Sequence, residues 1–219
     1  MTERLRASEV QDALPGWRVV LGRAHVTYRT GSFAVGLRLV EGVGRLAEEA
    51  DHHPDVDLRY PAVHISLSSH DVHGLTERDV RLAGRISELA AELGVEADHS
   101  SPQATEIAID ALDIPAVVPF WRAVLGYVDE PPPGPDASPA LLDPLGIGPP
   151  VWFQQMDAPR PQRNRIHLDV SVPHDVAADR IAAAQAAGGR LVSDAEAPAF
   201  WVLADPEGNE ACICTWQAR

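Results

Sequence analysis

The 219-residue sequence predicts an α+β protein made of two domains. Two observations carry this prediction. Strand-like alternation and helix-like spacing of apolar residues follow each other along the chain, and neither pattern dominates. Near the middle, Val95–Pro102 is polar, aperiodic and ends in proline, which is typical of a linker. We therefore expect one domain at residues 1–98 and another at 104–219, joined by a linker at 99–103.

Composition excludes several classes of function. The net charge is −14, and neither half has a basic stripe, so we expect no nucleic-acid partner and no membrane partner. No apolar run approaches the roughly 18 residues that a membrane span needs. The N-terminal MTERLRASEV has no apolar signal core, which predicts a cytoplasmic protein. Cys212 and Cys214 are expected to be reduced thiols in that compartment.

The first half alternates helix and strand patterns in the order α-β-β-α-β-β-α. Ser8 and Gln11 suggest a capping box at the first helix. Apolar residues recur at helical spacing after Ser32, whereas Ala62–Ser68 alternates between apolar and polar residues, as in a half-buried strand. Thr76 begins a second capping box. The expected helices are 8–14, 32–50 and 76–93, and the expected strands are 17–21, 24–28, 57–60 and 62–68.

Histidines are concentrated between Asp51 and Asp79. This stretch holds five of the nine histidines in the chain, namely His52, His53, His64, His70 and His73. Imidazole has an unperturbed pKa of about 6.5, so it gains or loses a proton near neutrality. At this point three explanations remain open: a metal site, a proton-transfer site, or chance.

The motifs in this stretch resemble those of a known family. HHP, a Tyr six residues after the Pro, VHISLSSH and LTERD resemble the pterin-4a-carbinolamine dehydratases, which share HHP, VHI.L.TH and LSERD. The resemblance covers about residues 5–98. It implies helices against one face of a four-stranded antiparallel sheet. It also implies the dehydration of a 4a-hydroxytetrahydropterin to the quinonoid dihydropterin, with no metal or organic cofactor.

The resemblance places three histidines in the site. It implies that His52 and His70 act mainly in proton transfer and that His53 mainly holds the pterin. Two adjacent imidazoles also discourage double protonation, which favours one neutral base at pH 7. A zinc site formed by the three is an alternative, but no cysteine is near and the spacing is not of the His-x3-His kind.

Further residues of the motif have supporting roles by the same resemblance. Pro54 fixes the backbone of the histidine pair and contributes to substrate binding. Asp79 either orients a site histidine or only caps its helix, and Glu48 is a candidate substrate contact. Val56 departs from the family, because many members carry an aromatic residue there. His64 is interpreted as structural, and His25 and His73 as solvated.

The second half repeats a pattern of a strand, a helix ending in glycine, and further strands. Residues 129–150 hold eight prolines and are expected to be irregular. The expected strands are 106–111, 151–156, 165–172, 200–203 and 210–215, with helices at 115–125 and 177–187 and a turn at 205–209. ALDIPAVVPFWRAVLGY, NRIHLDVSV and LADPEGNEACI resemble the glyoxalase-like branch of the vicinal-oxygen-chelate superfamily, which implies a paired βαβββ domain.

That superfamily binds a divalent metal through the first and last strands of each half. The matching positions are Glu106, Gln154 or Gln155, His167 and Cys212. Cysteine is not what the superfamily places at the last position, so we expect no functional metal there, although one remains possible. The alternative is a small-molecule pocket or plain core formed by the aromatic residues Trp121, Trp152, Phe153 and Trp201.

Three functional hypotheses follow. The first is a pterin-4a-carbinolamine dehydratase, acting on a small pterin substrate, with a fused binding domain. The second is a non-catalytic binding and oligomerisation protein. The third makes the second domain a metal-dependent lyase or dioxygenase. The complete histidine set favours the first, and the relatives of the first domain imply a homo-oligomer.

Overall fold

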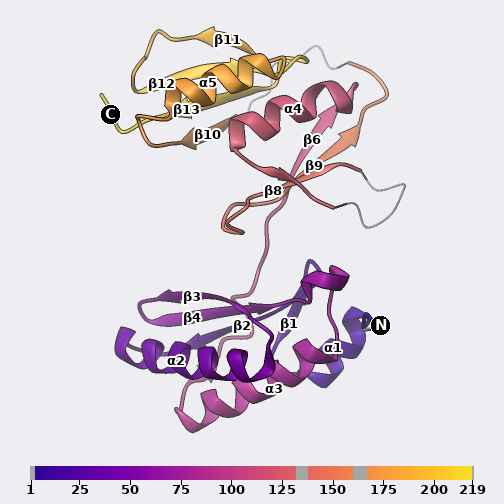
Figure 1. Ribbon diagram of the computed structural model, residues 1–219, viewed down its shortest axis with the longest axis vertical. Coiled ribbons are helices and arrows are strands. Elements are labelled where there is room, and N and C mark those ends of the chain that lie inside the picture. The colour runs from indigo at the N-terminus through magenta and orange to yellow at the C-terminus, as the bar shows by residue number, and fades with distance from the viewer. Residues whose placement is uncertain (1–2, 132–137, 160–166, 219) are drawn as a thin grey trace. The chain divides into compact units, whose positions relative to one another are not determined.

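The computed structural model describes residues 3–131, 138–159 and 167–218. The chain divides into two compact units, Met1–Ala104 and Thr105–Arg219, here named the first and the second unit (Figure 1). Among the described residues, no helix combines the length and the apolar character that crossing a bilayer requires.

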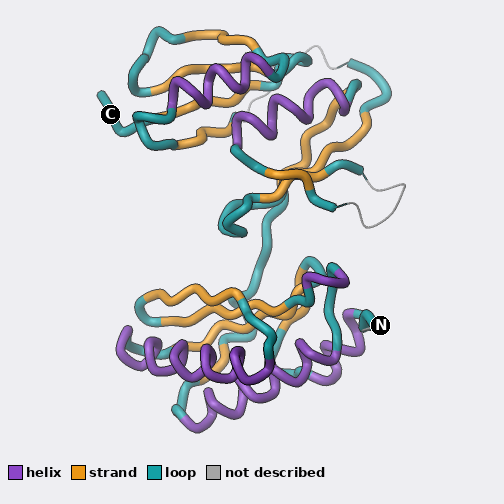
Figure 2. Tube along the Cα trace, viewed as in Figure 1, coloured by secondary structure: helices purple, strands orange, loops and turns teal. Residues whose placement is uncertain are grey.

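In the first unit, helices cover one face of an antiparallel sheet, as predicted (Figures 1 and 2). The helices are α1 (Ala7–Ala13), α2 (Phe33–Ala50) and α3 (Glu77–Glu92), with a short 3-10 helix, η1, at His70–Val72. The strands are β1 (Arg18–Val20), β2 (Arg23–Arg29), β3 (Asp55–Arg59), β4 (Ala62–Leu67) and β5 (Glu96–Ala97). The sheet has the order β1-β2-β4-β3, and β5 also pairs with β2.

The fifth strand corrects the sequence prediction. Glu96–Ala97, which lies in the polar segment Val95–Pro102 where the sequence predicted no strand, pairs with Tyr28 and Arg29 of β2. The carboxylate of Asp98 accepts two hydrogen bonds from the Arg29 guanidinium, at 2.7 and 3.2 Å. A polar, aperiodic sequence can form a short edge strand because backbone pairing needs no apolar pattern.

The helix starts agree with the sequence prediction in one case and differ in another. At α3, the Thr76 side chain caps the helix and Asp79 accepts from the Thr76 backbone, so the predicted capping box is confirmed. At α1, the Arg6 N–H donates to Glu9 at 2.8 Å, so the capping residues lie two positions before the predicted Ser8. Capping satisfies N–H groups that have no partner inside the helix.

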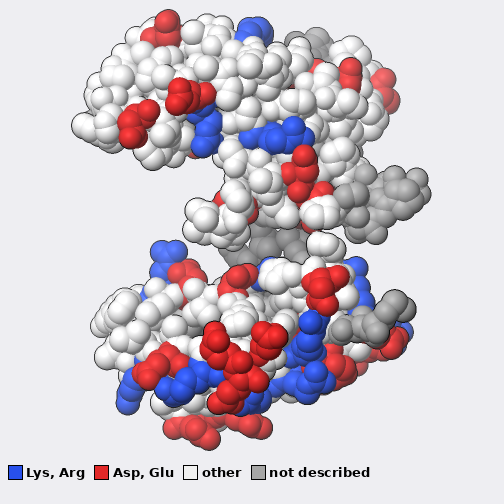
Figure 3. All heavy atoms as spheres, in the orientation of Figure 1, with Lys and Arg blue, Asp and Glu red and all other residues white. Residues whose placement is uncertain are grey.

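Alternating burial along β2 and the first half of β4 separates a core face from an open face, whereas Ser66 near the end of β4 is buried as well. Val26 and Ile65 are buried and pack in the cluster that also contains apolar residues of α2 and α3. On the opposite face lie His25 and His64, which are only partly buried. On the visible helical side of this unit, acidic and basic side chains are interspersed (Figure 3).

The second unit repeats a strand-helix-strand arrangement around two four-stranded sheets. Its helices are α4 (Ile114–Leu125) and α5 (Ala177–Ala186). One sheet joins β6 (Ile107–Ala111), β9 (Val151–Gln155), β8 (Ala140–Leu142) and β7 (Val128–Asp129), in that order. The other joins β10 (Leu168–Ser171), β13 (Glu210–Cys214), β12 (Phe200–Ala204) and β11 (Arg190–Ser193). Each sheet contains one parallel pair, β6–β9 or β10–β13, which confirms the predicted paired βαβββ architecture.

The expectation of irregular structure throughout residues 129–150 was wrong at two places, because Asp129 belongs to β7 and a further strand follows. Ala140–Leu142 forms β8 and pairs with β9. The Ala-Leu-Leu segment has no proline of its own, so its N–H groups remain available for pairing. Residues 132–137 of this stretch, and the first two residues of the strand predicted at 165–172, lie outside the described residues.

A buried aspartate links the two halves of the second unit. Asp205 is fully buried and accepts hydrogen bonds from the Trp121 indole at 3.0 Å and from the Asn209 backbone at 2.8 Å. In the same turn, Glu207 accepts the Asp113 N–H at 2.6 Å, next to the start of α4. The turn predicted at residues 205–209 therefore holds α4 against the strands of the second half.

Candidate functional site

The two site histidines at the end of α2 have different environments. Asp51, with a φ of 46°, turns the chain at the end of the helix. His52 follows; it is 7% exposed, and its Nε2 lies 2.8 Å from Oδ1 of Asp79. His53 is exposed, and its Nε2 lies 3.1 Å from Oε1 of Glu48. One imidazole is therefore held inside the domain while its neighbour lies at the surface.

Asp79 is the centre of a buried hydrogen-bond network. It is fully buried, and its Oδ2 accepts from the Ser69 hydroxyl at 2.8 Å and from the Thr76 N–H at 2.7 Å. The Ser69 hydroxyl and the Thr76 N–H both donate, so the Asp79 side chain acts as an acceptor at Oδ2. With Asp79 as a carboxylate, its Oδ1 accepts the hydrogen bond that Nε2 of His52 donates. The sequence left two roles open for Asp79, and the structure shows both: it caps α3 and it contacts a site histidine.

The same network reaches the turn that carries His70. Ser69 precedes His70, and its backbone N–H donates to the Gly74 carbonyl at 2.8 Å, which closes the turn around η1. His70 itself is exposed. The sequence analysis missed Ser69, although its place directly before a site histidine was an available signal. Asp79 therefore ties the HHP segment and the His70 turn to one carboxylate.

Asp71 carries an ion pair in η1. The Arg78 guanidinium, which hydrogen-bonds Asp71, lowers the pKa of that carboxyl below its usual value, and His52 adds a smaller lowering. His52 and Ser69, the residue before η1, both hydrogen-bond the Asp79 carboxylate. The structure thus brings His52 and the His70 turn together. Pro54 lies between His53 and β3, where it restricts His53 to an extended backbone.

His25 and His64 form a pair on the open face of the sheet. Nδ1 of His25 lies 3.2 Å from Nε2 of His64, and Nδ1 of His64 lies 2.9 Å from the Thr27 hydroxyl. Burial first, then the nearby His64 and Arg23, lowers the pKa of His25 to about 4. The expectation that His25 is solvated was therefore wrong, whereas His64 has the structural environment that the sequence suggested.

In the second unit, the candidate metal ligands do not come together as one set. Gln155 pairs with Ala111 of β6, so the two side chains lie on the same face of the sheet. The side-chain amide of Gln155 donates to the carbonyls of Ala111 and Leu112 at 3.3 and 2.8 Å. The period of two along a strand turns Gln154 and Gln155 to opposite faces of the sheet, so only one of the two can face a shared site. Glu106 precedes β6 and is exposed.

A different set of donors does come together. One ligand atom each from His167, Asp169 and Cys212 lie within 4.8 Å of one another, and Glu106 is not in this group among the described residues. Burial, followed by the Asp169 carboxylate that accepts the thiol hydrogen bond, raises the pKa of Cys212 to about 12. The sequence analysis missed Asp169, although it lies two residues after His167 in the predicted strand 165–172.

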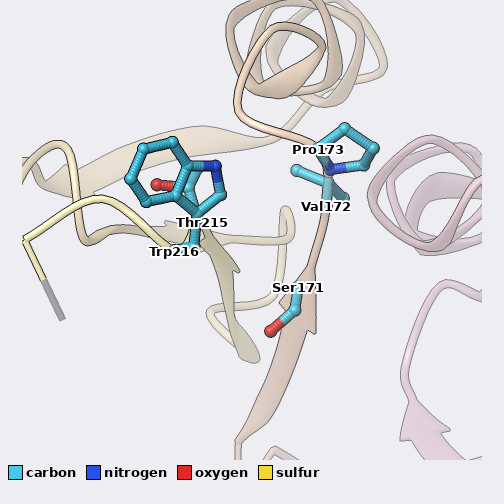
Figure 4. Close-up of a pocket in the computed structure, with 5 residues that line it drawn as sticks. All are labelled: Ser171, Val172, Pro173, Thr215 and Trp216. Carbon is cyan, nitrogen blue, oxygen red and sulfur yellow. The ribbon is translucent and has the colours of Figure 1, made fainter.

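A cavity lies beyond the ends of β10 and β13. It has a volume of about 480 Å³ and is lined by Ser171, Val172, Pro173, Thr215 and Trp216 (Figure 4). Trp216 is 70% exposed, and its indole N–H donates to Nδ1 of His174 at 3.3 Å. Of the aromatic residues for which the sequence left a pocket or plain core open, Trp121 and Phe153 belong to the buried core.

Comparisons with known proteins agree with the division into two parts. Residues 3–89 match the family model for pterin 4 alpha carbinolamine dehydratase, and residues 106–214 match the model for a glyoxalase-like domain. A protein from Herpetosiphon aurantiacus, provisionally named a pterin-4-alpha-carbinolamine dehydratase, is 41% identical over 90 residues. The match covers 40% of this chain and 94% of that relative.

Two solved structures are similar to parts of the chain. A structure titled transcriptional coactivator/pterin dehydratase, from Brucella melitensis, is 28% identical, with a TM-score of 0.38, and covers 40% of this chain and 99% of its own. A glyoxalase/bleomycin resistance protein/dioxygenase family enzyme from Burkholderia phytofirmans is 20% identical, with a TM-score of 0.43. That match covers 50% of this chain and 95% of the other.

Proposed function

Since the chain belongs to the pterin-4a-carbinolamine dehydratase family through residues 3–89, we propose that its first unit dehydrates a 4a-hydroxytetrahydropterin to the quinonoid dihydropterin. The reaction breaks the bond between C4a and the hydroxyl oxygen. The leaving oxygen takes up a proton, and the ring nitrogen next to C4a loses one, so the products are the dihydropterin and water. Both transfers are within the range of imidazole chemistry.

The observation that carries the proposal is the hydrogen bond between His52 and Asp79. Because Nε2 of His52 donates to the carboxylate, Nδ1 keeps a free lone pair and can accept a proton. We assign His52 as the base and the exposed His70 as the acid that protonates the leaving oxygen. His53, paired with Glu48 and fixed by Pro54, holds the pterin at the surface edge of the site. Residues of the chain supply every step, so the dehydration needs no metal and no organic cofactor.

A homo-oligomer and a cytoplasmic location belong to the same proposal. On α2, Phe33 and Leu37 are 50% and 54% exposed and lie one turn apart, which gives an apolar stripe that a second copy of the chain can cover. Cys212 and Cys214 lie two residues apart on β13, too close in sequence for an ordinary bridge to each other, which fits reduced thiols in a reducing compartment.

The test is turnover of a synthetic 4a-hydroxytetrahydropterin by the wild type and by His52 and His70 variants. If the chain is a non-catalytic binding protein, the wild type and the variants should all turn over the substrate no faster than buffer alone. The alternative of a metal enzyme acting through the second unit predicts that the first unit alone is inactive.

A further inference from the structure

We propose that His25 and His64 form a binding site for one divalent transition-metal ion, most favourably Cu²⁺, on the open face of the sheet in the first unit. The site is separate from the histidines to which we assign the dehydration, and it uses no residue of the second unit. Binding at this site therefore requires neither the pterin nor the proposed reaction.

The strand register brings the two imidazoles together. β2 and β4 are adjacent and antiparallel, with His25 opposite Ser66 and Thr27 opposite His64. His25 and His64 are therefore diagonal neighbours, and both project from the face of the sheet that the helices leave uncovered (Figures 1 and 2). Their ring centroids lie 5.4 Å apart. Since β2 and β4 are the two inner strands of the β1-β2-β4-β3 order, paired strands and not loops hold both side chains.

The distance between the two facing nitrogens suits one metal ion. Nδ1 of His25 lies 3.2 Å from Nε2 of His64. Two imidazole nitrogens on one ion, with metal–nitrogen bonds of about 2.0–2.1 Å and an angle of about 90–110° between them, lie about 2.9–3.4 Å apart. The observed distance falls inside this range, so small rotations of the two rings are enough to direct both lone pairs at one ion.

The outer nitrogen of each ring already has a hydrogen-bond acceptor. Nδ1 of His64 lies 2.9 Å from the Thr27 hydroxyl oxygen, and the His25 ring hydrogen-bonds the backbone of Val20. A carbonyl only accepts, so the His25 ring donates this bond, and Nε2 is the donor because Nδ1 faces His64. Metal-binding histidines almost always donate their second N–H to such a partner, which fixes the tautomer. The Thr27 and Val20 contacts thus favour the tautomers in which both facing nitrogens carry lone pairs.

Binding moves one proton within a single ring. In the metal-free protein, the contact between the two neutral rings is an N–H···N hydrogen bond, so one of the facing nitrogens carries a proton. As this N–H bond breaks, an N–H bond forms at the outer nitrogen of the same ring, by exchange with water. Both facing nitrogens then form bonds to the ion, and the two rings keep the same number of protons.

The ligand set and the surrounding charges decide which ions fit. Within the described residues, no third histidine, cysteine or acidic side chain places a ligand atom within 4.8 Å of both facing nitrogens, so water fills the remaining positions. Imidazole ligands favour late first-row ions, with Cu²⁺ bound more tightly than Ni²⁺ or Zn²⁺. The nearest cation, Arg23, is paired with the Asp55 carboxylate, and Asp57 lies opposite His64. These two acidic neighbours offset the charge of Arg23.

The test is titration of the full-length, tag-free protein with Cu²⁺, with pulsed electron paramagnetic resonance to count the coordinated imidazoles. We expect one bound ion per chain with two imidazoles. His25→Gln and His64→Gln should each remove the two-imidazole signal. Thr27→Val keeps both ligands and a residue that suits a strand, and it should weaken binding by about tenfold or more, because no hydroxyl then orients His64. This variant keeps the test valid if a histidine variant fails to fold.

The matched controls are His73→Asn, which removes an exposed histidine of the same unit, and His167→Gln, which removes an exposed histidine of the second unit. Both should leave the affinity and the signal unchanged. Absence of stoichiometric binding, or a two-imidazole signal that survives His25→Gln or His64→Gln, would overturn the proposal. Loss of the signal in either control would also overturn it, because the ion would then lie elsewhere. Unchanged affinity in Thr27→Val would contradict the site as well, since binding would not depend on the orientation of His64.

Discussion

Nε2 of His52 lies 2.8 Å from Oδ1 of Asp79, and the carboxylate is fully buried. The other oxygen of Asp79 accepts from the Ser69 hydroxyl and from the backbone of Thr76. A buried carboxylate with several donors is held in one orientation, and it fixes both the ring and the tautomer of its histidine partner. The predictions below follow from this contact and from the histidine environments around it.

The first prediction concerns the two histidines assigned to proton transfer. His52→Ala and His70→Ala should each lower turnover by roughly 10²-fold or more, since each variant loses one positioned acid or base. Steady-state kinetics on 4a-hydroxytetrahydropterin measures this loss. His73→Asn is the matched control, because His73 is exposed in the same turn and asparagine tolerates its φ of 46°. Full activity in either alanine variant would remove that histidine from the mechanism.

The second prediction concerns Asp79. Asp79→Asn should lower the free energy of unfolding by about 1–3 kcal/mol, because the amide nitrogen would face groups that are themselves donors. Turnover should fall as well, since His52 loses its fixed orientation. Urea unfolding and steady-state kinetics measure the two effects. The comparison is Asp71→Asn, which loses only a partly exposed ion pair with Arg78 and should lower stability less than Asp79→Asn does. Unchanged stability would mean that the network around Asp79 is absent in solution.

The third prediction concerns pH. The pKa of His25 is lowered to about 4 in the folded protein, so between about pH 6.5 and pH 4 the unfolded chain binds more protons than the folded one. The free energy of unfolding should therefore fall as the pH falls through this window. His25→Gln should reduce this dependence, as measured by urea unfolding across the window. An unchanged slope in His25→Gln would assign the acid sensitivity to other groups.

The fourth prediction concerns independence of the first unit. The buried residues of this unit's apolar cluster lie between Val10 and Ala90, and Asp98 is paired with Arg29. Residues 1–104 expressed alone should therefore fold and dehydrate at a rate close to that of the full chain. Aggregation or loss of activity in this fragment would show that the two units depend on each other.

The fifth prediction concerns metal. Dehydration should survive exhaustive chelation, because imidazole groups supply both proton transfers. Activity is measured before and after dialysis against a chelator, with elemental analysis of the same samples. Loss of activity on chelation, restored by one divalent ion, would replace the histidine mechanism with a metal-assisted one.

Most helices and strands of the first unit could be predicted from the sequence, because their apolar periodicity and their caps agree. The alternation in Ala62–Ser68 and the capping pair Thr76 and Asp79 are examples of such local signals. Glu96–Ala97 could not be found in this way, since its pairing with β2 depends on contacts between distant segments.

The candidate site was predictable in its residues but not in its connections. The motif identified His52, His70 and Asp79, whereas the bond between His52 and Asp79 spans 27 residues and depends on tertiary structure. The same limit applies in the second unit. Asp169 and Cys212 become neighbours only through the register of β10 and β13, which a single sequence does not reveal.

The measurement that tests the account most directly is the dehydration of 4a-hydroxytetrahydropterin by the purified full-length chain, followed by absorbance of the quinonoid dihydropterin. We predict a rate about 10²–10⁴-fold above the uncatalysed reaction, lost in His52→Ala and His70→Ala. A rate equal to that in buffer, from a protein shown to be folded, would contradict the proposed function.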